Sequence, residues 1–366
     1  MTESMQRAGV NTFSEILSEP DTWKNCLAAL DATAELGRLR GLLPPDGEWI
    51  FVGCGSSFYL ALIAAATWTL LTGETARAIP ASEILLFPKL LPSVSRPILI
   101  SRSGRTSEII EAGNYLMRRN QTSALAITCG TGTPIEKVSA HVIRLPIADE
   151  KSTVMTRSFS SMLLALQLLA AERGENSEFA RGIRALPGEM EPRMPEIDAT
   201  VRSLAGAQVF ADYVFLGQGP FYGVAQEAML KVKEMSCSYA QCFHTLEFRH
   251  GPKAIVSPET LVTFFLSESG FESEVSVLQE IKELGATTFV ITNDANAAVR
   301  ESADYLIELS LPVPEAARVA GAVIPGQLLG FHTGIRKGFD PDNPRNLTRV
   351  VMLSSASDGD SGRGAP

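Results

Sequence analysis

Short runs of apolar residues recur along the chain and alternate with longer segments of helical spacing. Each run is bounded by glycine, proline or small polar residues and is rich in Val, Ile, Leu and Phe, as expected of strands. Strands that alternate with helices predict parallel, doubly wound α/β sheets. The predicted strands are 50–53, 97–101, 124–128, 142–145, 213–217, 261–266, 288–292 and 305–309.

The second half of this pattern repeats the first. A glycine turn, Gly53-Cys54-Gly55, follows the first apolar run, and Gly217-Gln218-Gly219 follows the equivalent run 164 residues later. Ser101-Arg102-Ser103-Gly104 returns as Ser267-Glu268-Ser269-Gly270 at an offset of 166. Matches in the same order at a nearly constant offset indicate a duplicated domain. We therefore predict two tandem α/β domains.

The remaining segments are assigned around the repeat. Residues 1–45 carry apolar residues at helical spacing on either side of Pro20, which predicts an N-terminal helical hairpin. The segment between the copies is predicted to be helical and to be broken at Pro187 and Pro192. The predicted divisions are an arm (1–45), a first domain (46–173), a linker (174–205), a second domain (206–335) and a tail (336–366).

Length, composition and charge exclude several classes of protein. A length of 366 residues suits two domains, and 45% apolar residues suffice for two cores. The net charge of −9, without a basic run carrying aromatics, argues against nucleic acid as a partner. The most apolar stretch, 58–71, is too short to span a bilayer and is predicted to be a buried helix. No membrane partner is expected.

The five cysteines are scattered and lack metal-ligand spacing. They are most simply reduced thiols, and residues 1–15 do not resemble a signal peptide, so we expect a cytoplasmic protein. We expect neither a metal nor another cofactor.

The densest chemistry lies at 225–252. On a helix, Glu227, Lys231 and Glu234 would share one face, and His250 would lie on a loop nearby, next to Gly251-Pro252. A carboxylate, an ammonium and an imidazole in one place suit proton transfer. The alternative is an exposed helix with an ordinary Glu-Lys pair, worth only about 0.2–0.5 kcal/mol.

Two turns of the first copy suit a phosphate. Gly55-Ser56-Ser57 and the loop 101–106 each lead from a strand to a helix N-terminus, where free N–H groups favour anions. These residues are alternatively ordinary helix caps. A dinucleotide fingerprint fits poorly because Phe58 replaces its third glycine. In the second copy Glu268, Phe271 and Glu272 replace Arg102, Arg105 and Thr106, so only the first copy is suited to hold phosphate.

Several segments together resemble the tandem sugar isomerase (SIS) domain family. The chain is similar to the isomerase half of glucosamine-6-phosphate synthase and to the group of tagatose-6-phosphate ketose/aldose isomerases and amino-sugar-phosphate deaminases. The run 155–159 is more like this second group. The segments that carry the resemblance are 15–20, 53–57, 101–106, 227–234, 246–252 and 342–347.

The resemblance implies a role for each candidate residue. Glu234 matches the base that moves a proton between C1 and C2, and His250 matches the ring-opening histidine, donated in the synthase by the neighbouring subunit. Glu227 and Lys231 match groups that orient or assist. A homodimer with shared active sites is therefore implied. The residues that fall where the family binds the sugar phosphate are Ser56, Ser57, Ser101, Arg102, Ser103 and Thr106.

The chain departs from glucosamine-6-phosphate synthase at two places, and both limit the activity that the resemblance implies. The synthase's glutamine-hydrolysing domain has a cysteine next to the initiator methionine, whereas this chain starts Met1-Thr2-Glu3, so we expect that it is not a glutamine amidotransferase. Arg349 stands where the synthase has an imine-forming lysine, and a guanidinium cannot form an imine. We expect a sugar-phosphate aldose/ketose isomerase, acting through an enediol or enediolamine and with deamination as a variant. The alternative is a non-catalytic sugar-phosphate sensor.

Overall fold

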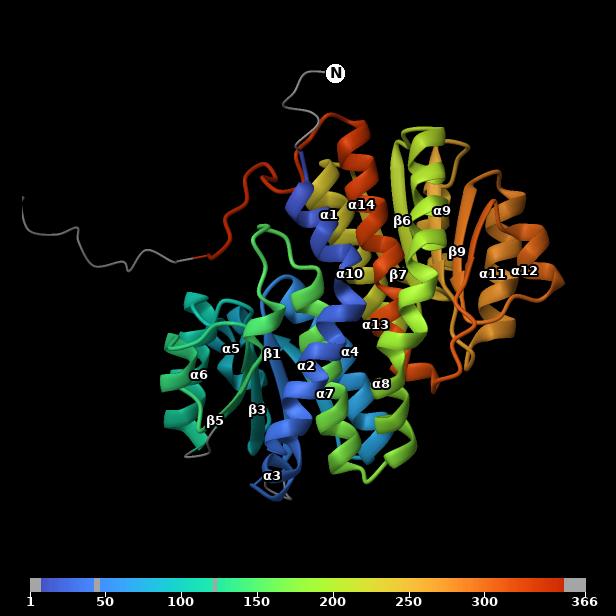
Figure 1. Cartoon of the computed structure of the whole chain (residues 1–366). Helices are drawn as coiled ribbons and strands as arrows, with labels where there is room; N and C mark the ends of the chain where they lie inside the picture. Colours follow the sequence, from blue (N-terminus) through green and yellow to red (C-terminus); the bar gives the residue numbers. More distant parts are fainter. Residues whose placement is uncertain (1–7, 43–46, 121–123, 352–366) are drawn as a thin grey trace, which may run out of the picture.

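Two parallel sheets form the framework of the protein in a computed structural model, which describes residues 8–42, 47–120 and 124–351 (Figure 1). The ends of the predicted arm and tail, 1–7 and 352–366, lie outside the described residues. In the first sheet the strand order is β2-β1-β3-β4-β5, and in the second it is β10-β9-β8-β6-β7. All neighbouring strands in the described residues pair in parallel. The strands are β1 (Glu48–Gly53), β2 (Ala76–Pro80), β3 (Ser95–Ile100), β4 (Leu125–Thr128), β5 (His141–Arg144), β6 (Asp212–Gly217), β7 (Ala240–His244), β8 (Thr260–Phe265), β9 (Thr287–Thr292) and β10 (Tyr305–Glu308).

The predicted doubly wound fold is confirmed, and the two copies have the same topology. Each sheet contains one strand that the apolar pattern missed, β2 or β7. These strands lie at sheet edges and are mostly half-buried, so their sequences, Ala-Arg-Ala-Ile-Pro and Ala-Gln-Cys-Phe-His, are not continuous apolar runs. An edge strand packs against fewer neighbours and therefore needs fewer apolar residues.

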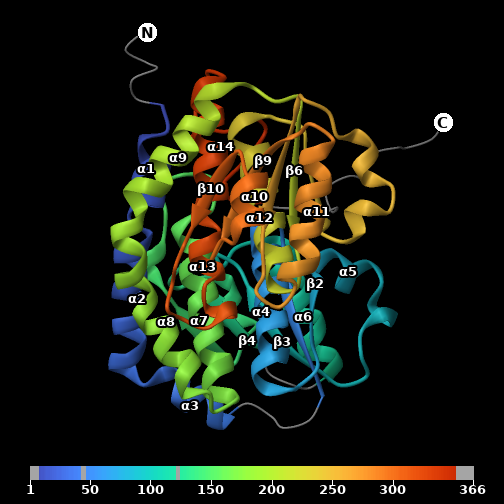
Figure 2. The same cartoon turned by 90° about the vertical axis from the view of Figure 1, so that its right-hand side faces the viewer.

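Helices cover both faces of each sheet. Figures 1 and 2 show α4 and α10 at the centre of the molecule, with the two sheets on either side. The larger helices are α1 (Val10–Leu17), α2 (Glu19–Thr33), α3 (Glu35–Leu42), α4 (Ser56–Thr72), α5 (Ala81–Leu86), α6 (Ser107–Asn120), α7 (Arg157–Arg173), α8 (Ser177–Met190), α9 (Met194–Ala207), α10 (Pro220–Ser236), α11 (Phe271–Glu283), α12 (Ala297–Ser302) and α14 (Ile324–Arg336).

The predicted helical arm contains three helices in the described residues rather than a hairpin. Of these, α2 packs on α7 and α8, and α1 packs on α14. Asp342, beyond α14, accepts hydrogen bonds from the backbone N–H groups of Asn11 (3.0 Å) and Thr12 (2.7 Å) at the start of α1. A carboxylate at a helix N-terminus satisfies free donors and favours the helix dipole. The two ends of the described chain are thereby joined.

The linker differs from the prediction at one proline. Pro192 lies in the short turn between α8 and α9, as expected of a helix-breaking residue. Pro187, however, lies inside α8, which continues to Met190. A proline in a helix removes one hydrogen bond. Here its ring is buried, and the packing of α8 on α2 and α7 offsets that loss.

One apolar core joins the two domains. It includes one face of each sheet together with α4, α7, α10 and α14, while two smaller clusters cover the outer faces. The helices approach one another closely at glycines of α10 and α14. A Cβ at Gly223 would overlap Ile63 of α4, and a Cβ at Gly330 would lie 2.6 Å from the carbonyl oxygen of Lys231. The relative position of the two domains is therefore fixed by close helix packing.

Gly330→Ala is expected to destabilise the protein by about 1–3 kcal/mol, because its Cβ meets the backbone of α10, which cannot give way as a side-chain end does. The matched control is Gly188→Ala on α8, where a Cβ meets open space and alanine favours the helix by up to about 1 kcal/mol. Urea unfolding of both variants measures the difference. Equal stability of Gly330→Ala and the wild type would contradict the packing described.

Candidate active site

A cavity of about 180 Å³ opens at the carboxyl ends of β1 and β3. These strands are neighbours whose following chains leave in opposite directions, the position at which doubly wound sheets bind ligands. The first domain, the end of α10 and the C-terminal segment 348–351 all contribute to its wall. The predicted site residues that line it are Ser56, Ser57, Ser101, Arg102, Ser103, Thr106, Glu234 and Arg349.

The glycine turn brings the N-terminus of α4 to this cavity. Gly53 and Gly55 allow the sharp turn: a Cβ on Gly53 would overlap the carbonyl of Ser57, and Gly55 has a φ of 56°. In the second domain Gly217 and Gly219 form the same turn, with a φ of 51° at Gly219. In the first copy the helix begins with Ser56 and Ser57, and both serines line the cavity.

The loop after β3 forms the other half of the predicted phosphate site. Ser101 Oγ accepts a hydrogen bond from the N–H of Gly104 and lies 3.2 Å from Thr106 Oγ1. Ser103 Oγ accepts from the N–H of Arg105 at 3.2 Å. The loop ends where α6 begins, so two helix N-termini, those of α4 and α6, lie at one cavity. Such a position favours an anion.

Lys231 lies fully buried between two carboxylates of its own helix. Its Nζ is 3.2 Å from Glu227 Oε1 and donates hydrogen bonds to Glu234 and, at 3.1 Å, to Ser56 Oγ. Burial alone would lower the pKa of Lys231, but the two carboxylates outweigh it and raise that pKa. The predicted common helix face is confirmed, and the alternative of an exposed surface pair is excluded.

Glu227 and Glu234 differ in their surroundings although they share one ammonium. Glu227 is fully buried, and burial raises its pKa to about 8 against the opposing effect of Lys231. Glu234 is 17% exposed and lines the cavity. Burial thus favours the protonated form of Glu227, and Glu234 is the carboxyl group that can reach a bound molecule.

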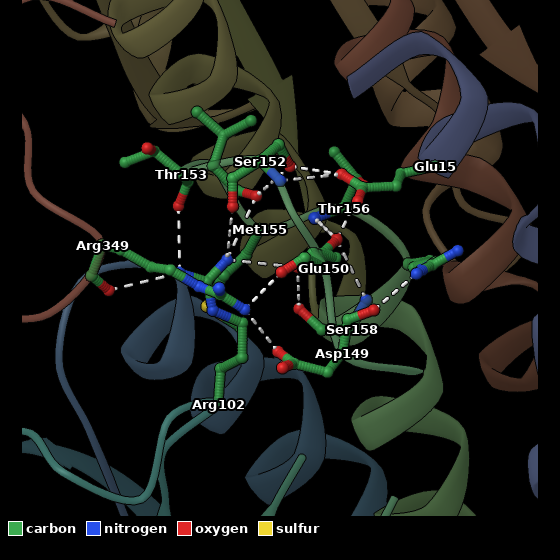
Figure 3. A network of polar contacts seen from close by, with 12 residues as sticks. Glu15, Arg102, Asp149, Glu150, Ser152, Thr153, Met155, Thr156, Ser158 and Arg349 are labelled. Carbon is green, nitrogen blue, oxygen red and sulfur yellow. Dashed lines mark hydrogen bonds and ion pairs between the residues drawn. The ribbon is translucent and has the colours of Figure 1, made fainter. Parts of the chain in front are cut away.

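Arg102 was predicted to contact the sugar phosphate, and in the structure it contacts groups of the protein itself. Its guanidinium pairs with Glu150 at 3.2 Å and donates to the carbonyl oxygens of Thr153 (3.0 Å) and Arg349 (3.2 Å), among others (Figure 3). Both residues of the ion pair are buried. Arg102 thus holds the loop 149–156 and the C-terminal segment against the loop 101–106. Its predicted contact with phosphate stays a prediction.

Two glutamates that the sequence did not single out for a role hold the loop 149–156. Glu150 accepts from the N–H (2.6 Å) and the hydroxyl (2.7 Å) of Thr156, and Glu15 accepts from the N–H of Lys151 at 2.6 Å and from Ser152 (Figure 3). This loop places Thr153 and Met155 in the cavity wall. The only signal in the sequence was that Glu15 belongs to one of the segments resembling the SIS family.

Of the two other residues that were predicted for the site, Arg349 lies at the cavity and His250 does not. Arg349 lines the cavity and pairs with Asp149 at 2.9 Å. His250 is exposed, directly after the turn η5 (Glu247–Arg249), and is not among the residues that line the cavity. One chain therefore does not bring His250 to Glu234.

In the described residues, no group of three or more His, Cys, Asp and Glu side chains is arranged to hold a metal ion. No helix within the same ranges has the length and apolar character needed to cross a bilayer.

Comparison with known proteins shows which family this chain belongs to. Residues 45–172 and 212–323, more than half of the chain, match the SIS domain. The chain belongs to the SIS domain family. This SIS protein is 30% identical to glucosamine-6-phosphate deaminase from Thermotoga maritima, with a TM-score of 0.77 over 94% of this chain and 100% of that chain. Tagatose-6-phosphate ketose/aldose isomerase from Escherichia coli has the same fold, with 22% identity and a TM-score of 0.82 over 96% of this chain and 98% of that one.

Among curated proteins, the SIS protein is 27% identical to glutamine–fructose-6-phosphate aminotransferase of Methanothermobacter thermautotrophicus over 355 residues. That match covers 95% of this chain but 58% of the relative. The chain thus spans somewhat over half the length of the curated relatives it matches.

The buried Glu227 predicts how stability depends on pH. Its raised pKa means that the folded state holds this proton more tightly than the unfolded state, so stability present at acidic pH is lost as pH rises through about 8. Glu227→Gln cannot titrate. Relative to this variant, the wild type should lose on the order of 4 kcal/mol of unfolding free energy between pH 5 and 9. Urea unfolding across this range measures the difference, and parallel pH profiles would contradict it.

Proposed function

We propose that this protein is an aldose/ketose isomerase that acts on a hexose or hexosamine 6-phosphate. The observation that carries the proposal is that hydroxyl groups near two helix N-termini and a carboxyl group held by a buried lysine line the same cavity. A phosphate held at the helix N-termini of α4 and α6 would leave the sugar chain directed at Glu234. The sugar-phosphate names of the solved relatives support the same substrate class.

In the proposed reaction Glu234 takes the proton from the carbon next to the open-chain carbonyl. The electrons of that C–H bond form the carbon–carbon double bond of an enediol, while the carbonyl oxygen gains a proton. Return of the proton to the neighbouring carbon, with loss of the hydroxyl proton from the oxygen that becomes the new carbonyl, completes the interchange of aldose and ketose. Lys231 holds Glu234 in place, and Ser56 orients the ammonium from the other domain.

An amino sugar would follow the same path to a different product. Removal of the C2 proton from a 2-amino aldose gives an enolamine, which tautomerises to an imine at C2. Water adds to that imine, and loss of ammonia leaves the ketose, so one water is consumed for each ammonia released. The 30% identity to a deaminase supports testing this branch. Arg349 stays protonated and can neutralise an oxyanion but cannot form an imine with the sugar.

We further propose that His250 opens the sugar ring in the cavity of a second copy, which makes the active unit a homodimer. The support is that His250 lies exposed and outside the cavity of its own chain. An imidazole can both accept and donate the ring-opening proton near neutral pH.

The proposal is tested by offering the purified protein a panel of hexose and hexosamine 6-phosphates and their ketose counterparts. Ketose formation and ammonia release are followed separately, and the unphosphorylated sugars serve as controls. Conversion of at least one phosphorylated sugar supports the proposal. Saturable binding of the same sugars without conversion would instead favour the sensor.

Glu234→Gln is expected to lower kcat at least about 100-fold, because the amide cannot carry the proton, while sugar-phosphate binding stays largely intact. The control is Glu178→Gln, which removes an exposed carboxylate from α8. Calorimetric binding and steady-state rates separate the two effects. Near wild-type turnover in Glu234→Gln would remove this residue from the mechanism.

Replacing Ser103 and Thr106 together by alanine is expected to weaken sugar-phosphate affinity about tenfold or more, since two hydroxyls at the cavity are lost. Ser203→Ala, at an exposed position of α9, is the control. Unchanged affinity in the double variant would locate the phosphate elsewhere.

Co-expression of Glu234→Gln with His250→Ala is expected to restore up to about a quarter of wild-type activity, because some mixed dimers contain one site with both groups intact. Both substitutions in one chain provide the inactive control. If purified heterodimers remain inactive, His250 does not act across the interface.

A further inference from the structure

The second domain contains a counterpart of the loop 101–106, which is the predicted phosphate site of the first domain. Ser267-Glu268-Ser269-Gly270 follows β8 as Ser101-Arg102-Ser103-Gly104 follows β3. In both loops the glycine N–H donates to the hydroxyl of the first serine, at 3.2 Å for Gly104 and 2.9 Å for Gly270. The two loops therefore share their hydrogen bonding over these four residues, although α11 begins at once after Gly270 and α6 begins only at Ser107.

A carboxylate from a distant segment occupies the second loop. Glu315, in the turn η7 (Glu315–Ala317), accepts hydrogen bonds through Oε1 from the N–H groups of Glu268 (2.6 Å) and Ser269 (3.2 Å). Its Oε2 accepts from the hydroxyl of Ser269 at 2.7 Å. Two successive amides and a hydroxyl around one anion form the arrangement by which loops hold oxyanions. In the first loop, no acceptor within the described residues is bound to the corresponding N–H groups of Arg102 and Ser103.

The other acidic side chains at the second loop have partners of their own. The carboxylate of Glu268 pairs with Arg318, whose side chain is 11% exposed. Glu274 is buried and accepts from the N–H of Ser267 at 2.7 Å and from its hydroxyl at 2.9 Å. Its burial raises its pKa to about 7. The carboxylate of Glu315 is thus the anion held by the amides of Glu268 and Ser269.

We propose that the loop 267–270 is a second oxyanion site, filled by the chain's own Glu315, and that this carboxylate restricts phosphate binding to the first domain. The ligand class that the emptied site would take is inorganic phosphate or a phosphate monoester. Removing the Glu315 carboxylate should therefore create a phosphate site where the wild type has none. The inference rests on contacts within the second domain and does not require the proposed reaction.

The test is a titration of isotope-labelled Glu315→Ala with inorganic phosphate at constant ionic strength, followed by the backbone amide resonances. The amides of Glu268 and Ser269 should shift saturably in this variant, with an affinity at least tenfold higher than in the wild type. The matched control is Glu301→Ala, which removes an exposed carboxylate from α12 and should behave as the wild type. The amides of Arg102 and Ser103 report the first domain independently, so a failure there leaves the present inference unaffected.

Glu315→Gln provides a second variant should the alanine variant fold poorly. Its side chain keeps an oxygen for the loop but lacks the charge, so phosphate should bind with an affinity between those of the wild type and Glu315→Ala. The inference is overturned if the amides of Glu268 and Ser269 show no saturable shift in either folded variant. Equal phosphate shifts at these amides in the wild type would also overturn it, because Glu315 would then not exclude the anion.

Discussion

A lysine ammonium buried between the two domains is the constraint on which the rest of the structure depends. Removing a charge from water costs several kcal/mol unless partners replace the water. Lys231 obtains those partners from two directions: Glu227 and Glu234 on its own helix, and Ser56 at the start of α4. Because Ser56 belongs to the first domain, the contact with Lys231 requires that α4 and α10 keep their relative position. The close approach of Gly223 to Ile63 and the continuous core hold the two helices in that position.

The two copies of the domain contribute different chemical groups to the cavity. Both copies form the same glycine turn, but the first helical residue is Ser56 in one and Pro220 in the other. Proline has neither a hydroxyl nor an N–H group to offer an anion. In the proposed reaction the first copy supplies the anion site, and the second supplies a helix whose far end carries the lysine and its two carboxyl groups. The contact of Glu315 with the loop 267–270 fits this proposed division, because a carboxylate of the chain already holds the N–H groups of Glu268 and Ser269.

Much of this arrangement could be predicted from local patterns. Buried strands appear as apolar runs, and the common face of Glu227, Lys231 and Glu234 follows from helical spacing alone. The serines at the cavity follow from their place after β1 and β3. The missed features are pairings between distant segments: Arg102 with Glu150, Glu15 with the loop 149–156, and Glu315 with the second loop. No local period marks such pairs, because each residue alone is compatible with a solvated surface.

In the proposed reaction, Glu234 exchanges a proton with a sugar phosphate held in the first domain. This exchange is measured most directly by incubating the protein with a hexose 6-phosphate substrate in deuterated water and following hydrogen at C1 and C2 by NMR. Since Glu234 is partly exposed at the cavity, solvent deuterium is expected to enter the transferred position. A sugar phosphate that saturates the cavity yet gains no deuterium at either carbon would contradict it.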